Sequence, residues 1–116
     1  MEQTEYLEKY IFTDFKNLNE GSDKETEYQF SEADFEIILQ RVEHNGIGVY
    51  NINSWLNGEA FEVAEHEDFK KKATDPKWYT KAFLTLKSRQ PGLTYAATYK
   101  VSNKLLAKHT EANSEE

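Results

Sequence analysis

The three histidines are the first residues to consider for catalysis or metal binding. His44 falls where a helix is expected to end, a position at which it interacts favourably with the terminal carbonyls. His66 stands in an acidic stretch between residues 62 and 68, and His109 lies near the end of the chain. No HExxH spacing is present, and three dispersed histidines do not form a zinc ligand set. We interpret His44 as a helix cap and His66 as an exposed residue, and predict no metal site.

Patterns for nucleophilic, carboxylate or phosphate chemistry are equally weak. Neither Ser31 nor Ser54 lies in a G-x-S-x-G nucleophile elbow. The Gly46-Ile47-Gly48 stretch is too short for a phosphate loop, and it runs from a helix into a strand, the reverse of the dinucleotide pattern. Glycosidase chemistry needs two carboxylates at a fixed separation, which spacing alone does not identify among so many acids. We therefore predict a non-enzymatic chain without a cofactor.

A basic segment could bind nucleic acid. Lysines beside aromatic residues bind backbone phosphates and stack bases. The segment from residue 70 to 100 contains Lys70, Lys71, Lys72, Lys77, Lys81, Lys87, Arg89 and Lys100, interleaved with Trp78, Tyr79, Tyr95 and Tyr99. Against this function, Tyr79, Tyr95 and Tyr99 fall on predicted core faces, and the net charge of −7 repels polyanions. Nucleic-acid binding through this segment is the alternative function.

Charge is strongly segregated along the chain. Residues 1–67 hold sixteen acids against four Lys or Arg, whereas residues 68–108 hold two acids against ten bases. Either the two halves attract one another within the fold, or two faces of opposite sign meet different partners. We favour the intramolecular interpretation.

The composition indicates one small domain. The 116 residues can bury roughly two-thirds of their unfolded surface in one core, to which the 14% aromatic residues contribute much of the volume. We predict a single domain over residues 1–108 and a disordered acidic tail over 109–116. No cysteine is present, so disulfides are excluded. No apolar run approaches the ~20 residues of a membrane span, and residues 1–5 do not resemble a signal peptide, so we expect a cytoplasmic protein without membrane contact.

Three helices are predicted to support a small sheet. Apolar spacing indicates helices over about residues 5–18, 32–44 and 76–88, although residues 10–13 are also rich in strand formers. Ser31 and Asp75 are the expected N-caps of the second and third helices, and Gly46 is expected beyond the end of the second. Residues 17–24 read as a loop. A last short helix after Ser102 would carry Leu105 and Leu106.

The strands are predicted at residues 49–65, as a hairpin around Asn57-Gly58, and at 93–101. A regular type I′ hairpin pairs residues whose numbers sum to 115. That register places Tyr50, Ile52, Ser54, Leu56, Glu59, Phe61, Val63 and Glu65 on the core side, and Asn51, Asn53, Trp55, Ala60, Glu62 and Ala64 on the other. The predicted fold is an α+β domain with a mainly antiparallel sheet and helices on one face.

Trp55 is the residue of greatest functional interest, because the alternation turns it away from the core. Either the terminal helix carrying Leu105 and Leu106 covers it, or it anchors a partner, since tryptophan is enriched at binding hot spots. We predict a partner site of Trp55, Asn51, Asn53, Glu59 and Glu62. The predicted function is a non-catalytic protein-binding module, such as a stoichiometric inhibitor or immunity-type protein, whose acidic surface binds a basic protein.

Overall fold

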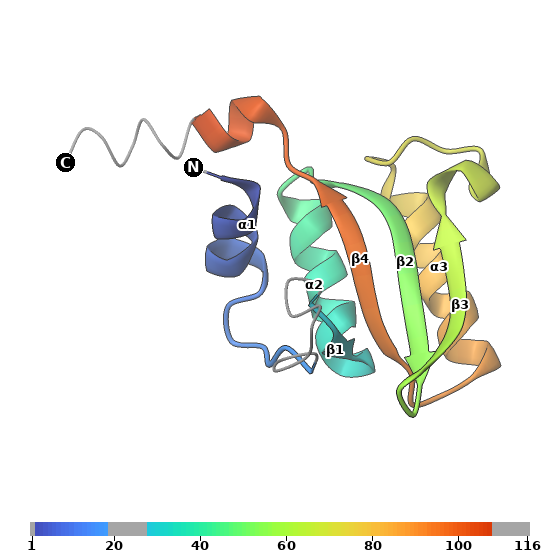
Figure 1. Ribbon diagram of the computed structural model, residues 1–116. Helices are drawn as coiled ribbons and strands as arrows, with labels where there is room; N and C mark the ends of the chain where they lie inside the picture. The colour runs from blue at the N-terminus through green and yellow to red at the C-terminus, as the bar shows by residue number, and fades with distance from the viewer. Residues whose placement is uncertain (1, 19–27, 108–116) are drawn as a thin grey trace.

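The computed structural model describes residues 2–18 and 28–107 and has an α+β architecture (Figure 1). Residues 19–24 of the expected loop at 17–24, and the expected tail at 109–116, lie outside these residues. The helical elements are α1 (Gln3–Tyr6), the π-helix η1 (Leu7–Ile11), α2 (Glu32–His44), the 3-10 helix η2 (His66–Phe69) and α3 (Pro76–Arg89). The strands are β1 (Phe30–Ser31), β2 (Gly48–Leu56), β3 (Glu59–Glu65) and β4 (Thr94–Lys100).

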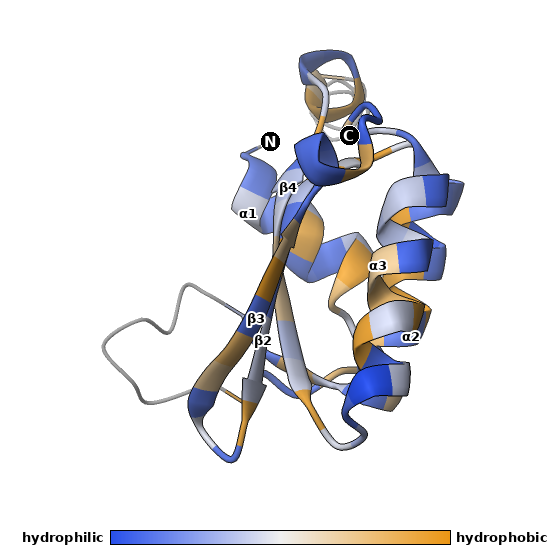
Figure 2. Cartoon of the chain, turned by 90° about the vertical axis from the view of Figure 1, so that its right-hand side faces the viewer, coloured by the Kyte–Doolittle hydropathy of each residue, from blue (hydrophilic) through white to orange (hydrophobic). Residues whose placement is uncertain are grey.

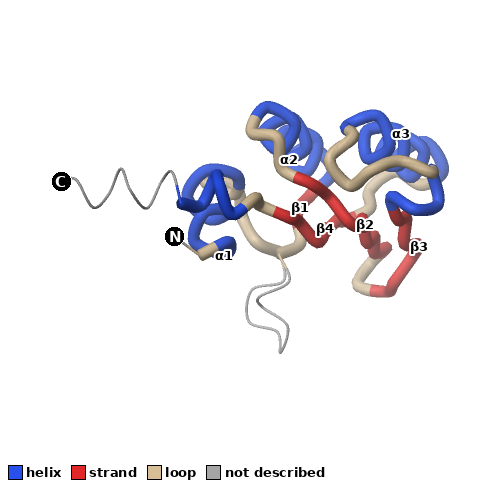
Figure 3. The backbone as a smooth tube through the Cα atoms, turned by 90° about the horizontal axis from the view of Figure 1, so that it is seen from above, coloured by secondary structure: helices blue, strands red, loops and turns tan. Residues whose placement is uncertain are grey.

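The four strands form one antiparallel sheet in the order β1-β4-β2-β3. Helices α2 and α3 lie side by side against one face of this sheet (Figures 2 and 3). Tyr95 of β4 fixes the orientation, because its ring stacks on Phe35 of α2 at 5.2 Å and meets Phe83 of α3 at 5.0 Å. The predicted fold class, with helices on one face of an antiparallel sheet, is confirmed.

Local capping explains why α2 and α3 form where the sequence predicts them. The Ser31 hydroxyl accepts a hydrogen bond from Asp34 N at 3.3 Å, and Gly46 takes a left-handed φ of 67° just beyond the helix. Asp75 caps α3 by accepting from Lys77 N at 2.9 Å, with Pro76 at the first helical position. Each helix therefore carries its own start signal, independent of its neighbours.

The N-terminal helix is shorter than expected. It spans Gln3–Ile11, not residues 5–18. The Thr13 hydroxyl donates to the Glu8 and Lys9 carbonyls, and Asp14 adopts a left-handed φ of 79°, so the last helical carbonyls bond a side chain and not a further turn. The end of β4 anchors this segment, because Gln3 donates to Tyr99 O at 2.9 Å and accepts from Val101 N at 3.0 Å.

The hairpin turn is as predicted, but its register is not. Asn57 and Gly58 have φ of 52° and 84°, the two positive values of a type I′ turn. Leu56 pairs with Glu59 and Trp55 with Ala60, after which Phe61 is an extra residue in β3. Beyond this bulge the numbers of paired residues sum to 116, so Ser54 faces Glu62 and Ile52 faces Ala64. A one-residue slip reverses the faces of a strand.

The predicted sheet face is therefore wrong for the β3 residues beyond the bulge, and it is also wrong for Tyr50 of β2. Beyond the bulge, Glu62 and Ala64 point to the helix side of the sheet, whereas Val63 and Glu65 point to the opposite side. Tyr50, expected in the core, is also an extra residue, between Val49 and Asn51 of the β2–β4 pairing, and it is exposed. The other β2 assignments hold, with Ile52 and Ser54 buried toward the helices.

The core contains nearly all of the predicted apolar faces. Phe35, Ile38, Leu39 and Val42 of α2 are buried in it, and so is the Tyr79–Leu86 face of α3. Trp78, which the helical pattern did not place there, is only 1% exposed, and its indole N–H donates to Ala73 O at 3.3 Å. Leu105 and Leu106 pack against this core from a short helix at residues 103–107, which Ser102 caps as predicted.

Candidate functional site

The sheet face opposite α2 and α3 is the main candidate surface; we call it the open face. Because Tyr95 points toward the helices, its neighbours Thr94 and Ala96 point the other way. The strand register then places three rows of side chains on the open face: Thr94, Trp55 and Ala60; Ala96, Asn53 and Val63; Thr98, Asn51 and Glu65. Figure 2 shows α2 and α3 on the other side of these strands. The rows combine one large aromatic residue, one valine and one glutamate with small, amide and hydroxyl side chains.

Trp55 lies partly buried in the first of these rows and is not part of the core cluster. The terminal helix does not cover it. Trp55 pairs with Thr94 at the start of β4, whereas residues 103–107 follow the end of β4 at Lys100. Six residues of strand separate the two ends, about 20 Å at 3.3 Å per residue. Figure 1 shows the terminal helix at the end of the sheet remote from the hairpin turn.

Asn51 and Asn53 lie on the same face as Trp55, as the sequence predicts. Their side-chain amides approach one another, with Asn53 Nδ2 3.5 Å from Asn51 Oδ1. Both side chains are partly exposed. An amide presents both donors and an acceptor, so these two residues can bond the backbone or polar side chains of a bound protein.

Glu59 and Glu62 do not join Trp55 on this face. Glu59 closes the hairpin at its rim and is exposed. Glu62 points to the helix side and forms an ion pair with Arg89 of α3, at 2.6 Å between Oε2 and Nη1. The bulge in β3 is the reason that Glu62 does not lie beside Trp55 as predicted. It brings Val63, which is 54% exposed, to the open face, where regular alternation had placed Glu62.

His66 occupies a defined surface position at the end of β3. Its Nδ1 lies 2.8 Å from Lys71 O, and its ring centroid lies 6.2 Å from those of Tyr50 and Trp78. The preceding Glu65 forms a capping box with Asp68. These contacts organise η2, so we interpret His66 as a structural residue of this turn.

The basic segment does not expose its aromatic residues. Trp78, Tyr79, Tyr95 and Tyr99 are all buried, so none can stack on a base. Burial raises the pKa of the Tyr79 and Tyr99 hydroxyls, and it raises that of Tyr95 to about 12, with a smaller contribution from the Glu32 carboxylate. These hydroxyls are therefore core groups.

Direct pairing between the acidic and basic halves is limited. Within residues 2–18 and 28–107, Arg89–Glu62 is the only ion pair that joins the two halves, and Arg41–Asp14 lies within the acidic half. The intramolecular interpretation of the charge segregation therefore rests on one direct contact. Most of the lysines of α3 and its flanking loops face solvent.

In the described part of the chain, no three His, Asp or Glu side chains come together as a metal-binding group. No helix there is long and apolar enough to cross a membrane. Comparisons with protein-family models, curated proteins and solved structures found no match to this chain.

Proposed function

We propose that this chain is a non-catalytic protein-binding module, of the kind used by stoichiometric inhibitors and immunity-type proteins, that binds a basic protein through the open face. The observation that carries the proposal is the position of Trp55, partly exposed on a sheet face that α2 and α3 leave uncovered. Tryptophan is enriched among the residues that carry most of the binding energy at protein interfaces.

Exposed carboxylates on and beside the open face support a basic partner. Glu65 belongs to the open face and Glu59 to its rim, both exposed, and Glu67 and Asp68 follow in η2. Such carboxylates accelerate association with a cationic protein and favour it over an acidic competitor. A stable interface buries about 800 Å² per partner, so the partner would also contact the rim of the hairpin. Nucleic-acid binding has less support, because the aromatic residues of the basic segment are buried and cannot stack on bases.

The experiment is comparative affinity capture from the source organism with quantitative mass spectrometry. Wild type is compared with a Trp55→Ala/Val63→Ser double variant of the open face. The matched control is Ile37→Ser/Leu84→Ala, which changes two exposed apolar residues on α2 and α3. We expect a basic protein to be retained by wild type and by the control and lost from the open-face variant. Capture profiles that are the same for all three chains would contradict the proposal.

A further inference from the structure

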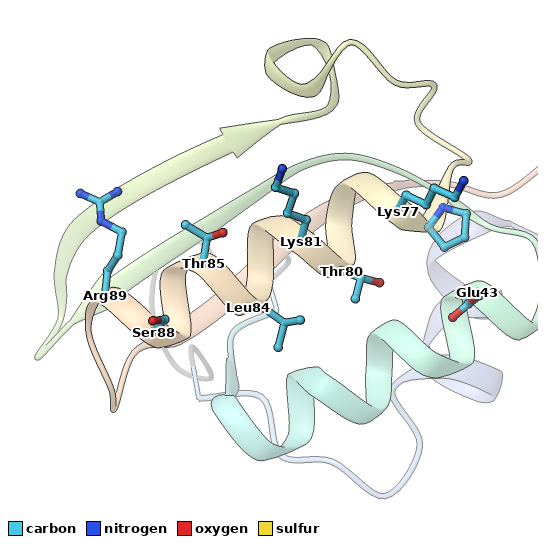
Figure 4. A pocket seen from close by; sticks show the side chains of 9 residues that line it. Glu43, Lys77, Thr80, Lys81, Leu84, Thr85, Ser88 and Arg89 are labelled. Carbon is cyan, nitrogen blue, oxygen red and sulfur yellow. The ribbon is translucent and has the colours of Figure 1, made fainter.

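A second surface lies on the outer side of α3. A groove of about 710 Å³ is lined by nine residues, eight of them from α3 and one, Glu43, from α2. We call it the α3 groove. Figure 4 shows Leu84 pointing from α3 toward α2, whereas Lys77 and Lys81 point away from α2. This surface is separated from the open face by the whole sheet and helix layer.

The side chains of the α3 groove form two rows set by the helical repeat. Residues four apart on a helix lie on one line, so Lys77, Lys81, Thr85 and Arg89 form one row and Thr80, Leu84 and Ser88 form another. The first row is basic. The second is apolar at its centre, because Leu84 is 51% exposed.

The cations of the basic row are largely unneutralised. Arg89 is paired with Glu62, but in the part of the chain that the structure describes neither Lys77 nor Lys81 has an acid within 4.0 Å. Exposed lysines beside an exposed leucine match a ligand that has carboxylates on one flank and apolar side chains on the other. A polyphosphate backbone would leave Leu84 without an apolar contact.

We infer that the α3 groove binds an acidic amphipathic helix of a second protein partner. Lys77 to Arg89 spans about 18 Å at 1.5 Å per residue, so about three turns of a helix would fill the groove. Its apolar residues would cover Leu84, and its acidic flank would lie along Lys77 and Lys81, as in other helix-in-groove complexes. This site is independent of the open face, and together the two would make the chain a link between a basic and an acidic protein.

The test is an NMR titration of the isotope-labelled full chain with a synthetic peptide of about twelve residues, with leucines at helical spacing and glutamates on one flank. The same peptide with lysine in place of glutamate is the ligand control. We expect shift changes confined to the α3 groove for the acidic peptide, and affinity at least about tenfold weaker for the lysine peptide. No shift at about 1 mM acidic peptide would overturn the inference.

Chain variants locate the interaction. Lys81→Glu should weaken binding of the acidic peptide at least about tenfold, whereas Lys104→Glu, the same charge change on the exposed terminal helix, should leave it within about twofold of wild type. Leu84→Ser should also weaken it. Equal effects of the two lysine variants would overturn the site, as would tighter, Lys81-dependent binding of a DNA oligonucleotide. Trp55→Ala should leave peptide binding unchanged, which separates this result from the fate of the open-face proposal.

Discussion

The Ser54 hydroxyl joins both backbone groups of Glu62, its partner across the hairpin. It donates to Glu62 O at 2.8 Å and accepts from Glu62 N at 3.2 Å, directly beside the extra residue Phe61. A buried side chain thus satisfies the backbone where the bulge disrupts the ladder. This contact maintains the register that turns Val63 toward the open face and Glu62 toward Arg89.

The first prediction concerns this hydroxyl. Ser54→Ala should lower the free energy of unfolding by about 1 kcal/mol, because it removes two hydrogen bonds between a buried hydroxyl and the backbone of Glu62. Urea denaturation measures the change. Ser88→Ala, an exposed hydroxyl of α3, is the matched control and should stay within about 0.5 kcal/mol of wild type. Equal losses for the two variants would show that the Ser54 hydroxyl does not stabilise the bulge.

The second prediction concerns the aromatic centre of the core. Phe35 is fully buried between Tyr95 and Phe83, so Phe35→Ala should cost about 3–5 kcal/mol of unfolding free energy. Ser31→Ala, which removes only the N-cap of the same helix, should cost about 1 kcal/mol. Denaturant melts of both variants give the comparison. A Phe35 variant as stable as the Ser31 variant would contradict this packing.

The third prediction concerns alkaline pH. Burial raises the pKa of Tyr95 to about 12 from an ordinary 10.0, and it also raises the pKa of Tyr79 and Tyr99. A folded-state pKa above the unfolded one stabilises the fold fully below the unfolded value. Stability should therefore fall as pH rises from about 10 toward 12 and beyond. Tyrosinate absorbance and circular dichroism, followed together, test this. Titration of all seven tyrosines with the ordinary pKa of 10.0 while the fold stays intact would contradict it.

The fourth prediction distinguishes the two tryptophans. Trp78 is 1% exposed, whereas Trp55 is only partly buried. In a Trp78→Phe variant, acrylamide should quench the remaining Trp55 fluorescence several-fold more effectively than it quenches Trp78 in a Trp55→Phe variant. Matching circular dichroism spectra would establish that both variants are folded. Equal quenching constants would mean that Trp55 is shielded and unsuited to anchor a partner.

Features with local causes could be predicted from the sequence. The caps Ser31 and Asp75 and the Asn57-Gly58 turn act through neighbouring residues, so α2, α3 and the hairpin were placed correctly. The end of the first helix was missed because apolar spacing through residue 18 outweighed the effect of the Thr13 side chain on the helical carbonyls. The pattern for the turn predicts its own type but not an irregularity three residues later.

In the candidate site, too, the residues that follow a local pattern were placed correctly and the others were not. Trp55, Asn51 and Asn53 were placed on the correct face because alternation along β2 is regular beyond Tyr50. Glu62 was placed wrongly and Val63 missed, because the turn pattern does not encode the bulge or the contacts beside it, the Ser54–Glu62 hydrogen bonds across the hairpin and the Arg89–Glu62 ion pair. Ser54 was the available signal, since a serine among apolar core positions needs a hydrogen-bond partner.

Calorimetric titration of the captured partner with two single variants tests most directly whether the open face is the interface. Trp55→Ala should weaken binding by at least about 2 kcal/mol, roughly thirtyfold in Kd, with its melting temperature close to that of wild type. Leu84→Ala, an exposed apolar change on the other side of the molecule, should leave the Kd within about twofold of wild type. A Trp55→Ala variant that is folded and binds the partner as tightly as wild type would contradict the open face as the interface.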